Sequence, residues 1–285
     1  MRFEFIRAEK ANYPIELLCS ALEVSRSGYY AWLDRVPSTR RREDEKLLAE
    51  IRASVARGRG AYGSPRVHRD LVARGLRVGR KRVERLMREN GLRGRKRRRY
   101  RATTLSTHGL QRHKNVLARQ FAVERIDDVW AGDITCIPTT SGWLYLAVVL
   151  DLCSRRIVGW AMEQHMREEL VIRAMEMALF ARSAPRLFHS DQGSQYASID
   201  FQQLLAKHAI KPSMSRRGNC WDNAVVESFF DSMKTELDLS ERPLPVDQAK
   251  SAVFDYIEVF YNRQRLHSAL DYQPPVEFEG ALVAA

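Results

Sequence analysis

Hydrophobic residues recur at helical spacing through the first third of the chain. The spacing predicts helices near residues 15–22, 25–34, 42–57, 66–73 and 80–90. Ser25 is placed to cap the second of these helices. Because short helices joined by tight turns are typical of helix-turn-helix units, we expect a helix-turn-helix-like segment at residues 1–38 and a helix-turn-helix-like DNA-binding domain at residues 39–92.

After residue 126 the pattern changes to strands that alternate with helices. Apolar runs predict strands at residues 129–137, 143–152, 156–162, 186–190 and 210–214. Helical spacing predicts helices at residues 167–182, 201–208 and 223–237, the first of which turns Leu170, Ala174, Met177 and Ala178 inward. This order predicts an α/β domain at residues 125–240, a mixed sheet flanked by helices. Residues 241–285 then form a C-terminal helix and tail that complete its core.

Charge divides the chain into a basic part and an acidic part. Residues 1–120 carry 31 Lys and Arg against 12 Asp and Glu, a net charge of +19. Residues 121–285 carry 16 Lys and Arg against 23 Asp and Glu, a net charge of −7. The first part is therefore suited to a polyanion, and the second to binding cations or to chemistry with carboxylates.

The basic charge is densest between Arg80 and Arg101, where twelve basic residues accompany two acidic ones. A solvated helix surface usually mixes both signs, so we expect this region to contact DNA phosphates. The expected contacts in the helix at residues 80–90 are Arg80, Lys81, Arg82, Arg85 and Arg88. A basic linker at residues 93–124 adds the run Arg95, Lys96, Arg97, Arg98 and Arg99.

Cysteine usage and hydropathy predict a soluble, cytoplasmic protein. The four cysteines, at positions 19, 136, 153 and 220, are far apart, as is typical of free thiols in a reducing compartment. A zinc site that uses His108 and His113 is the alternative, but no cysteine pair lies near them. No signal peptide is visible, and the longest apolar run is about half of the roughly 20 residues that a membrane helix needs.

Three acidic residues occupy positions where a strand–helix fold could bring them together. Asp133 interrupts an apolar strand, where a carboxylate is costly unless it is paired or bound to a cation. Asp191 follows another strand at the carboxyl end, which is the usual place for a ligand site in α/β sheets. Glu227 shares one flank of its predicted helix with Asp231 and Lys234, although an ordinary charged flank would also give this pattern.

Three convergent carboxylates suit attack on a phosphodiester bond. Two Mg²⁺ ions can activate the attacking oxygen and stabilise the leaving oxygen, and they prefer a few carboxylate ligands. Lys234 could then hold a DNA phosphate without competing for the metal. The sequence contains no Walker loop, Rossmann glycine pattern or Ser-His-Asp arrangement that would indicate a rival chemistry.

Several sequence words resemble those of known DNA-joining enzymes. The 35 residues between Asp191 and Glu227 match the D,D-35-E spacing of the DDE transposase and retroviral-integrase superfamily, and Lys234 matches the basic residue often found seven positions later. The words at residues 24–30, 62–67, 189–196, 215–223 and 261–267 are similar to those of bacterial insertion-sequence family three, OrfB-type transposases. The zinc-binding histidine and cysteine pairs that open retroviral integrases are absent from the sequence.

The resemblance implies a fold, an activity and partners. It implies an RNase H-like catalytic core, a requirement for Mg²⁺ or Mn²⁺, and catalysis by Asp133, Asp191 and Glu227. It further implies 3′-end cleavage and strand transfer on the terminal inverted repeats of an element and on target DNA, near the bacterial nucleoid, by a homo-oligomer. The family commonly fuses this frame to an upstream OrfA product, and the absence of a sustained heptad pattern here fits the downstream part alone.

Two other functions share some of these features. An RNase H-like nuclease or resolvase would have the same fold and metals but would cut without joining. A DNA-binding repressor with a decayed enzyme domain would lack catalysis, and the intact set of three carboxylates weighs against it.

Overall fold

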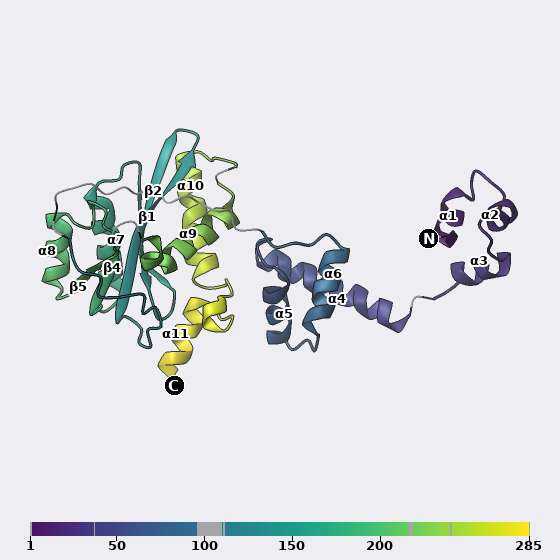
Figure 1. The fold of residues 1–285 in the computed structure, drawn as a ribbon, viewed down its shortest axis with the longest axis horizontal. Coiled ribbons are helices and arrows are strands. Elements are labelled where there is room, and N and C mark those ends of the chain that lie inside the picture. Colours follow the sequence, from purple (N-terminus) through teal and green to yellow (C-terminus); the bar gives the residue numbers. More distant parts are fainter. Residues whose placement is uncertain are drawn as a thin grey trace. The chain divides into compact units, whose positions relative to one another are not determined.

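The computed structural model describes residues 2–36, 38–95, 110, 112–216, 219–239 and 241–284, without the side chain of Cys220 (Figure 1). These residues form two compact units, Met1–Arg52 and Ala53–Ala285. The following paragraphs take each unit by itself.

The first unit is built from short helices around a small apolar core. Its helices are α1 (Arg2–Glu9), α2 (Ile15–Ala21), α3 (Arg26–Leu33) and most of α4 (Thr39–Arg57). Ser25 caps α3 by accepting a hydrogen bond from the Gly28 amide, as predicted. The sequence analysis missed α1, because its charged residues conceal that Ile6 is fully buried against α2 and α3.

In the second unit, α5 (Ser64–Ala73) and α6 (Arg80–Glu89) follow the last turn of α4 in the chain. The two helices pack against each other. Both helices were predicted from their spacing. The residues that face inward from them are Val67, Leu71, Val83, Leu86 and Met87, all of which are buried. The basic residues of α6 are left on its remaining surface.

The α/β domain contains one mixed sheet in the order β3-β2-β1-β4-β5. Its strands are β1 (Val129–Thr139), β2 (Gly142–Asp151), β3 (Ile157–Glu163), β4 (Leu187–Ser190) and β5 (Lys211–Met214). The first three strands pair antiparallel, whereas β1, β4 and β5 pair parallel. The expected α/β fold is confirmed: a mixed sheet flanked by helices, preceded in the sequence by a helical region.

Helices cover both faces of the sheet (Figure 1). On one face, α7 (Glu168–Ala181) and α8 (Ile199–Lys207) bury an apolar cluster with the strands. The prediction that Met177 points inward was wrong, since its side chain is 39% exposed and Val171 and Met175 are buried instead. On the other face, β1 contacts α9 (Ala224–Leu237), which follows the short helix η1 (Cys220–Asn223).

The C-terminal segment packs onto both α9 and the sheet. It consists of α10 (Val246–Phe254), the π-helical turn η2 (Asp255–Tyr261), η3 (Ser268–Leu270) and α11 (Pro275–Ala284). The side-chain amide of Asn262 accepts a hydrogen bond from the Ile157 backbone N–H and donates one to the Ile157 carbonyl. It therefore pairs with β3 as a neighbouring strand would. Arg265 donates to the Glu236 carboxylate and to Ser232 Oγ, which ties this segment to α9.

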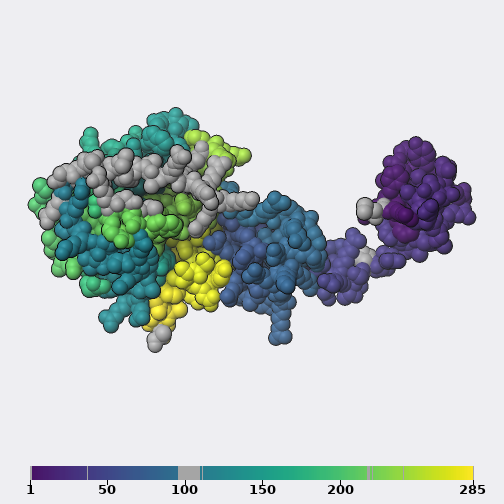
Figure 2. Space-filling view, viewed as in Figure 1, coloured from purple at the N-terminus to yellow at the C-terminus, as the bar shows by residue number. Residues whose placement is uncertain are grey.

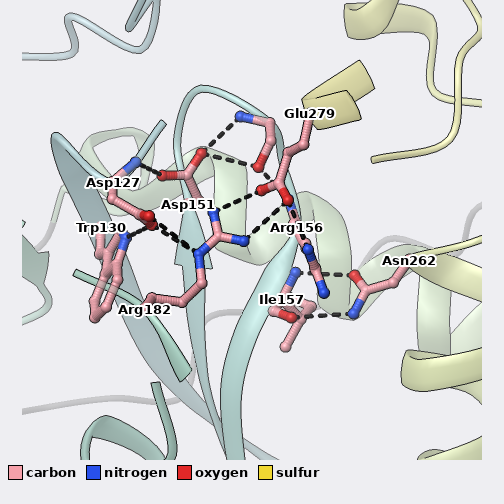
Figure 3. A network of polar contacts seen from close by, with 9 residues as sticks. Asp127, Trp130, Asp151, Arg156, Ile157, Arg182, Asn262 and Glu279 are labelled. Atoms are coloured by element: carbon pink, nitrogen blue, oxygen red, sulfur yellow. Dashed lines mark hydrogen bonds and ion pairs between the residues drawn. The ribbon is translucent and has the colours of Figure 1, made fainter. Parts of the chain in front are cut away.

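A second polar network fastens α11 to the sheet (Figure 3). Glu279 on α11 accepts from Arg156 at 2.6 Å and from both terminal nitrogens of Arg182 at 2.9 Å. Burial alone would raise the pKa of Glu279, but hydrogen bonds from Arg182 and Arg156 hold that pKa below its usual value. Arg182 also donates to Asp127, so one guanidinium joins α11 to the loop that leads into β1.

The helix-turn-helix-like part of the second unit contacts the C-terminal segment directly, as Figure 2 shows. The Tyr62 hydroxyl donates to the Gln264 carbonyl and accepts from the Leu266 amide at 2.9 Å. Arg66 Nε donates to the Leu266 carbonyl at 3.0 Å. The sequence words at residues 62–67 and 261–267 therefore meet, although about 200 positions separate them.

Removing Arg265 should destabilise the protein strongly. Arg265 and Glu236 are almost fully buried, so Arg265→Met leaves an uncompensated carboxylate and should cost about 3–5 kcal/mol. The matched control is Arg173→Met, whose pair with Glu163 is exposed and should contribute less than about 1 kcal/mol. Urea unfolding followed by tryptophan fluorescence measures both. Similar small losses in the two variants would contradict the expected role of Arg265.

Candidate active site

Parallel pairing of β1 with β4 brings two of the predicted site residues together. The register pairs Ala131 with His189. Asp133 lies two residues further along β1, and Asp191 lies two residues after His189, directly after the end of β4. Trp130, Gly132 and Ile134 alternate toward the cluster under α7 and α8, so Asp133 faces the side of the sheet that α9 covers. The two carboxylates therefore lie near the carboxyl end of β4 and on the same face of the sheet.

Glycines beside each aspartate permit this arrangement. A Cβ atom at Gly132 would lie 2.5 Å from the buried Phe188 ring, so any larger residue would require that ring to move. A Cβ atom at Gly193 would lie 2.9 Å from Asp191 Oδ1, which accepts a hydrogen bond from the Gly193 amide. Asp133 Oδ1 accepts from the Ile134 amide in a similar way. Both carboxylates are thus oriented by the backbone next to them.

Helix α9 supplies Glu227 and Lys234 from the facing side. Its apolar stripe of Val226, Phe229, Phe230 and Met233 is buried, which leaves Glu227 and Lys234 half-buried on its flank, as predicted. Just before this helix, Asn223 Nδ2 donates to the Gly132 carbonyl at 3.1 Å. This hydrogen bond fixes the start of α9 against the strand position that precedes Asp133.

The electrostatics of the site show that its acids influence one another. Burial first, and then the charge of Asp191, raise the pKa of Asp133 well above its ordinary value, and Glu227 adds to this effect. Burial and the charges of Asp231 and Asp191 raise the pKa of Glu227. Burial lowers the pKa of Lys234, against the attraction of Cys136, Asp231 and Asp133. A cation placed among these carboxylates would relieve their repulsion.

The donor set suits a hard divalent cation in its chemistry, since carboxylate oxygens are the ligands that Mg²⁺ and Mn²⁺ prefer. Within the described ranges, no three Asp, Glu, His or Cys side chains lie close enough together to hold a metal ion between them. The structure thus brings Asp133, Asp191 and Glu227 into electrostatic range without drawing them into one coordination sphere.

Sequence reasoning did not single out Asp222, which is a second centre of charge at this end of the domain. Its side chain is fully buried and accepts hydrogen bonds from Arg119 and Arg216. Arg216 hydrogen bonds first, and then Arg119, hold the pKa of Asp222 far below its ordinary value although burial opposes them. The word at residues 215–223 contains Arg216 and Asp222, but nothing local indicates Arg119 as their partner.

His189 is part of β4 and directs its side chain to the serines of β5 and the residue after it. Its two ring nitrogens are 2.9 Å from Ser213 Oγ and 3.2 Å from Ser215 Oγ. Burial lowers the pKa of His189 to about 4, so the ring is neutral at physiological pH. Its place is structural, in the polar layer next to Asp191.

The predicted DNA-contacting residues are only partly described. On α6, Arg80, Lys81 and Arg88 are exposed, whereas Arg82 and Arg85 are half-buried and Arg85 pairs with Glu89. Arg95 donates to the carbonyls of Thr235 and Glu236 at the end of α9. Lys96, Arg97, Arg98 and Arg99 lie outside the described residues, as does His108 of the alternative zinc site.

Part of the expected linker is fixed to the α/β domain. The amides of Val116 and Leu117 donate to Ser213 Oγ on β5, and the Leu117 side chain is buried.

Among the described helices, none is both long and apolar enough to cross a membrane.

Replacing Asp133 with asparagine should stabilise the metal-free protein at neutral pH. Because the pKa of Asp133 is raised in the fold, the folded state binds more protons than the unfolded state, and stability falls as pH rises from the ordinary carboxyl pKa of about 4 toward the raised value. Asp133→Asn removes this loss but keeps an oxygen for the Ile134 amide. We expect a higher melting temperature than wild type at pH 7, and a difference that shrinks near pH 4.

The same melting experiment tests for cation binding. Added Mg²⁺ should raise the melting temperature of the wild type, because binding to the folded state alone stabilises it, and should raise that of Asp133→Asn much less. Equal melting temperatures for the two proteins at pH 7, with and without Mg²⁺, would show that Asp133 is neither strained nor a ligand.

Comparison with known families agrees with these features. The model of an HTH-like domain matches residues 42–100, and two models of an integrase core domain match residues 124–220 and 208–275. The integrase catalytic core domain of HTLV-2, solved in complex with magnesium, is similar at 20% identity and a TM-score of 0.43. The match covers 53% of this chain and 95% of that one.

Curated relatives match over much greater lengths. The transposase InsF of insertion sequence IS3A from Escherichia coli (strain K12) is 39% identical over 288 residues, which is the whole of both chains. The uncharacterized 31 kDa protein of insertion element IS600 from Shigella sonnei is 42% identical over 92% of this chain and 97% of its own. By this full-length similarity, together with its integrase core and HTH-like domains, the chain belongs to the family of InsF transposases of the insertion sequence IS3.

Proposed function

We propose that this protein transposes an insertion sequence by cutting the 3′ ends of the element and joining them to target DNA. The observation that supports this most strongly is the convergence of Asp133 and Asp191 near the carboxyl end of β4, opposite Glu227 on α9, in a chain of the InsF transposase family. Phosphodiester transfer needs an activated oxygen and a stabilised leaving oxygen, and this constellation can serve both steps.

Asp133, Asp191 and Glu227 would hold one or two divalent ions, Mg²⁺ or Mn²⁺. The bound ions would supply Lewis-acid stabilisation of the reacting phosphate. The raised pKa values of Asp133 and Glu227 support this assignment, because a cation favours the ionised carboxylates that metal-free burial disfavours. To hold one ion jointly, the three side chains would have to lie closer together than they do in this structure.

Lys234 would position the phosphate backbone of the DNA end. It lies two helical turns after Glu227 on the same flank of α9, and its charge acts on Asp133. A half-buried ammonium on this flank of the helix would contact a substrate phosphate while the carboxylates remain available to the metal.

DNA would be held mainly by the helix-turn-helix-like region. The exposed basic residues of α6 and the run at residues 95–99 would bind phosphates of the terminal inverted repeats, and Arg82 and Arg85 could read bases. We further propose that the protein acts as a homo-oligomer on DNA and together with an upstream OrfA-type product. A nuclease that cuts without joining is the alternative, and it differs only in strand transfer.

Neutral variants of the three acids should abolish cleavage. Asp133→Asn, Asp191→Asn and Glu227→Gln each remove one anionic ligand, so each should lower 3′-end cleavage at least about a hundredfold with little effect on DNA binding. Labelled DNA that carries the element's ends, with Mg²⁺ and a plasmid target, reports cleavage and joining separately. Full activity in any one variant would remove that residue from the site, and cleavage without joining by the wild type would favour the nuclease.

Lys234→Ala should impair both steps while the protein stays folded. If the amine holds a phosphate, the variant loses about tenfold or more in cleavage and joining, and Lys234→Arg recovers part of that loss because the charge remains. The control is Lys207→Ala, which removes an exposed lysine of α8. Strand transfer at the wild-type rate by Lys234→Ala would place this lysine among ordinary surface residues.

The basic residues of α6 should determine much of the salt dependence of binding. Alanine at Arg80, Lys81 and Arg88 should flatten the plot of log affinity against log salt by about 0.9 for each phosphate contact that is lost. Fluorescence anisotropy with DNA of the terminal repeat, between low and moderate salt, measures this slope. An unchanged slope would mean that α6 does not contact the backbone.

A further inference from the structure

Asp222 organises two arginines at the same end of the domain as the carboxylates. Its Oδ1 accepts from Arg119 Nε at 2.8 Å and from Arg216 Nη2 at 2.9 Å. Its Oδ2 accepts from Arg216 Nε at 2.9 Å, from the Arg216 amide at 3.0 Å and from Asn115 Nδ2 at 2.9 Å. Five hydrogen bonds saturate this buried carboxylate, so both guanidinium groups are held in fixed orientations.

The arginines themselves are not buried. The side chain of Arg216 is 59% exposed and that of Arg119 is 43% exposed, whereas Asp222 is completely enclosed. Arg119 Nη2 also donates to Asn219 Oδ1, but within the described ranges the Nη1 group of neither arginine has a partner. Two cations share a single anion, so one positive charge is left over, with donor groups that reach the solvent.

Three separate links place this pair beside the proposed catalytic residues. The Ser215 amide donates to the Ser190 carbonyl, and Gln192 Nε2 donates to the Ser215 carbonyl. Ser215, the residue before Arg216, is thus hydrogen-bonded to both sequence neighbours of Asp191. Asn223, next to Asp222, is bonded to Gly132 and so fixes the pair relative to Asp133. Glu227 lies little more than one helical turn after Asp222 in the chain.

The pair also lies on the face of the sheet that α9 covers. His189 stands opposite Ala131 in the β1–β4 register and so shares a face with Asp133. Asn115 donates to Asp222, and the next residue, Val116, donates its amide to Ser213 Oγ, which is 2.9 Å from a ring nitrogen of His189, so Asp222 lies on that same face. A DNA strand whose end reaches the carboxylates would therefore run close to these arginines.

We propose that Arg119 and Arg216, held in place by Asp222, form a binding site for a DNA backbone phosphate next to the strand end that is cut and joined. Two guanidiniums with outward N–H groups match the planar, two-oxygen face of a phosphodiester. The inference rests on the proposed function. The phosphate belongs either to the element's end or to the target, since both carry the same chemistry.

The experiment combines protein variants with neutral DNA linkages. Single methylphosphonates are introduced one at a time near the cleavage point of the element's end, and in a second series into target DNA. We expect one linkage at which the neutral group lowers wild-type activity about tenfold. Arg119→Gln and Arg216→Gln should show a similar loss on unmodified DNA and no further loss at that linkage. An effect in 3′-end cleavage assigns the phosphate to the element, and an effect in joining of precut ends alone assigns it to the target.

The chain offers a matched control in Arg186. It makes a bidentate pair with Asp128 and is 63% exposed, but it precedes β4 and so lies at the opposite end of that strand from Asp191. Arg186→Gln should therefore cleave and join at the wild-type rate. Arg216→Lys keeps a cation on Asp222 for folding, yet should still lose the outward donor and the sensitivity to the neutral linkage.

The outcomes separate this inference from the function on which it rests. A wild-type protein that neither cuts nor joins would overturn the proposed function. A wild-type protein that is active, with folded Arg119→Gln and Arg216→Gln variants that match it, would overturn the phosphate site alone. Losses in these variants that add to the effect of every neutral linkage would also overturn it, because the arginines would then act only through the fold.

Discussion

The site depends on the parallel pairing of β1 with β4, which sets two carboxylates side by side in a partly buried position. Like charges at such a place repel, and burial strengthens the repulsion by excluding water. The pairing persists because the rest of the domain supports it. Gly132 lets the strands approach over the Phe188 ring, and the backbone amides of Ile134 and Gly193 hold the two side chains.

Helix α9 brings the third acid, Glu227, to the two aspartates, and hydrogen bonds at each end hold the helix in place. At its start Asn223 is bonded to the strand beside Asp133, and near its end Glu236 is bonded to Arg265 and to the Tyr256 hydroxyl. Since Gln264 and Leu266 also contact Tyr62, the short C-terminal segment joins the helix that carries Glu227 to the helix-turn-helix-like region. The region proposed to bind DNA and the helix that carries Glu227 thus share one structural support.

Much of the fold followed from local patterns. The sequence pattern located all five strands to within two residues, most clearly for β2, because a strand that is buried on both faces is almost continuously apolar. Helical spacing located α5, α6, α7 and α9 for a similar reason. It failed for α1, whose single fully buried residue, Ile6, is too little to form a recognisable stripe, and for Met177, which lies at the edge of its stripe.

The sequence by itself determined the α/β order of elements and the separation of basic and acidic regions. It also determined the positions of the three acids, where an ionised carboxylate would need a partner or a bound cation. Only the tertiary structure decided which groups meet. Arg119 and Asn115 reach Asp222 across more than 100 residues, and Arg265 reaches Glu236 from the loop that follows η2. A local pattern records which face of an element is apolar, but it does not name the partner of a buried charge. That partner is fixed by strand register and helix packing, which arise only when the whole domain folds.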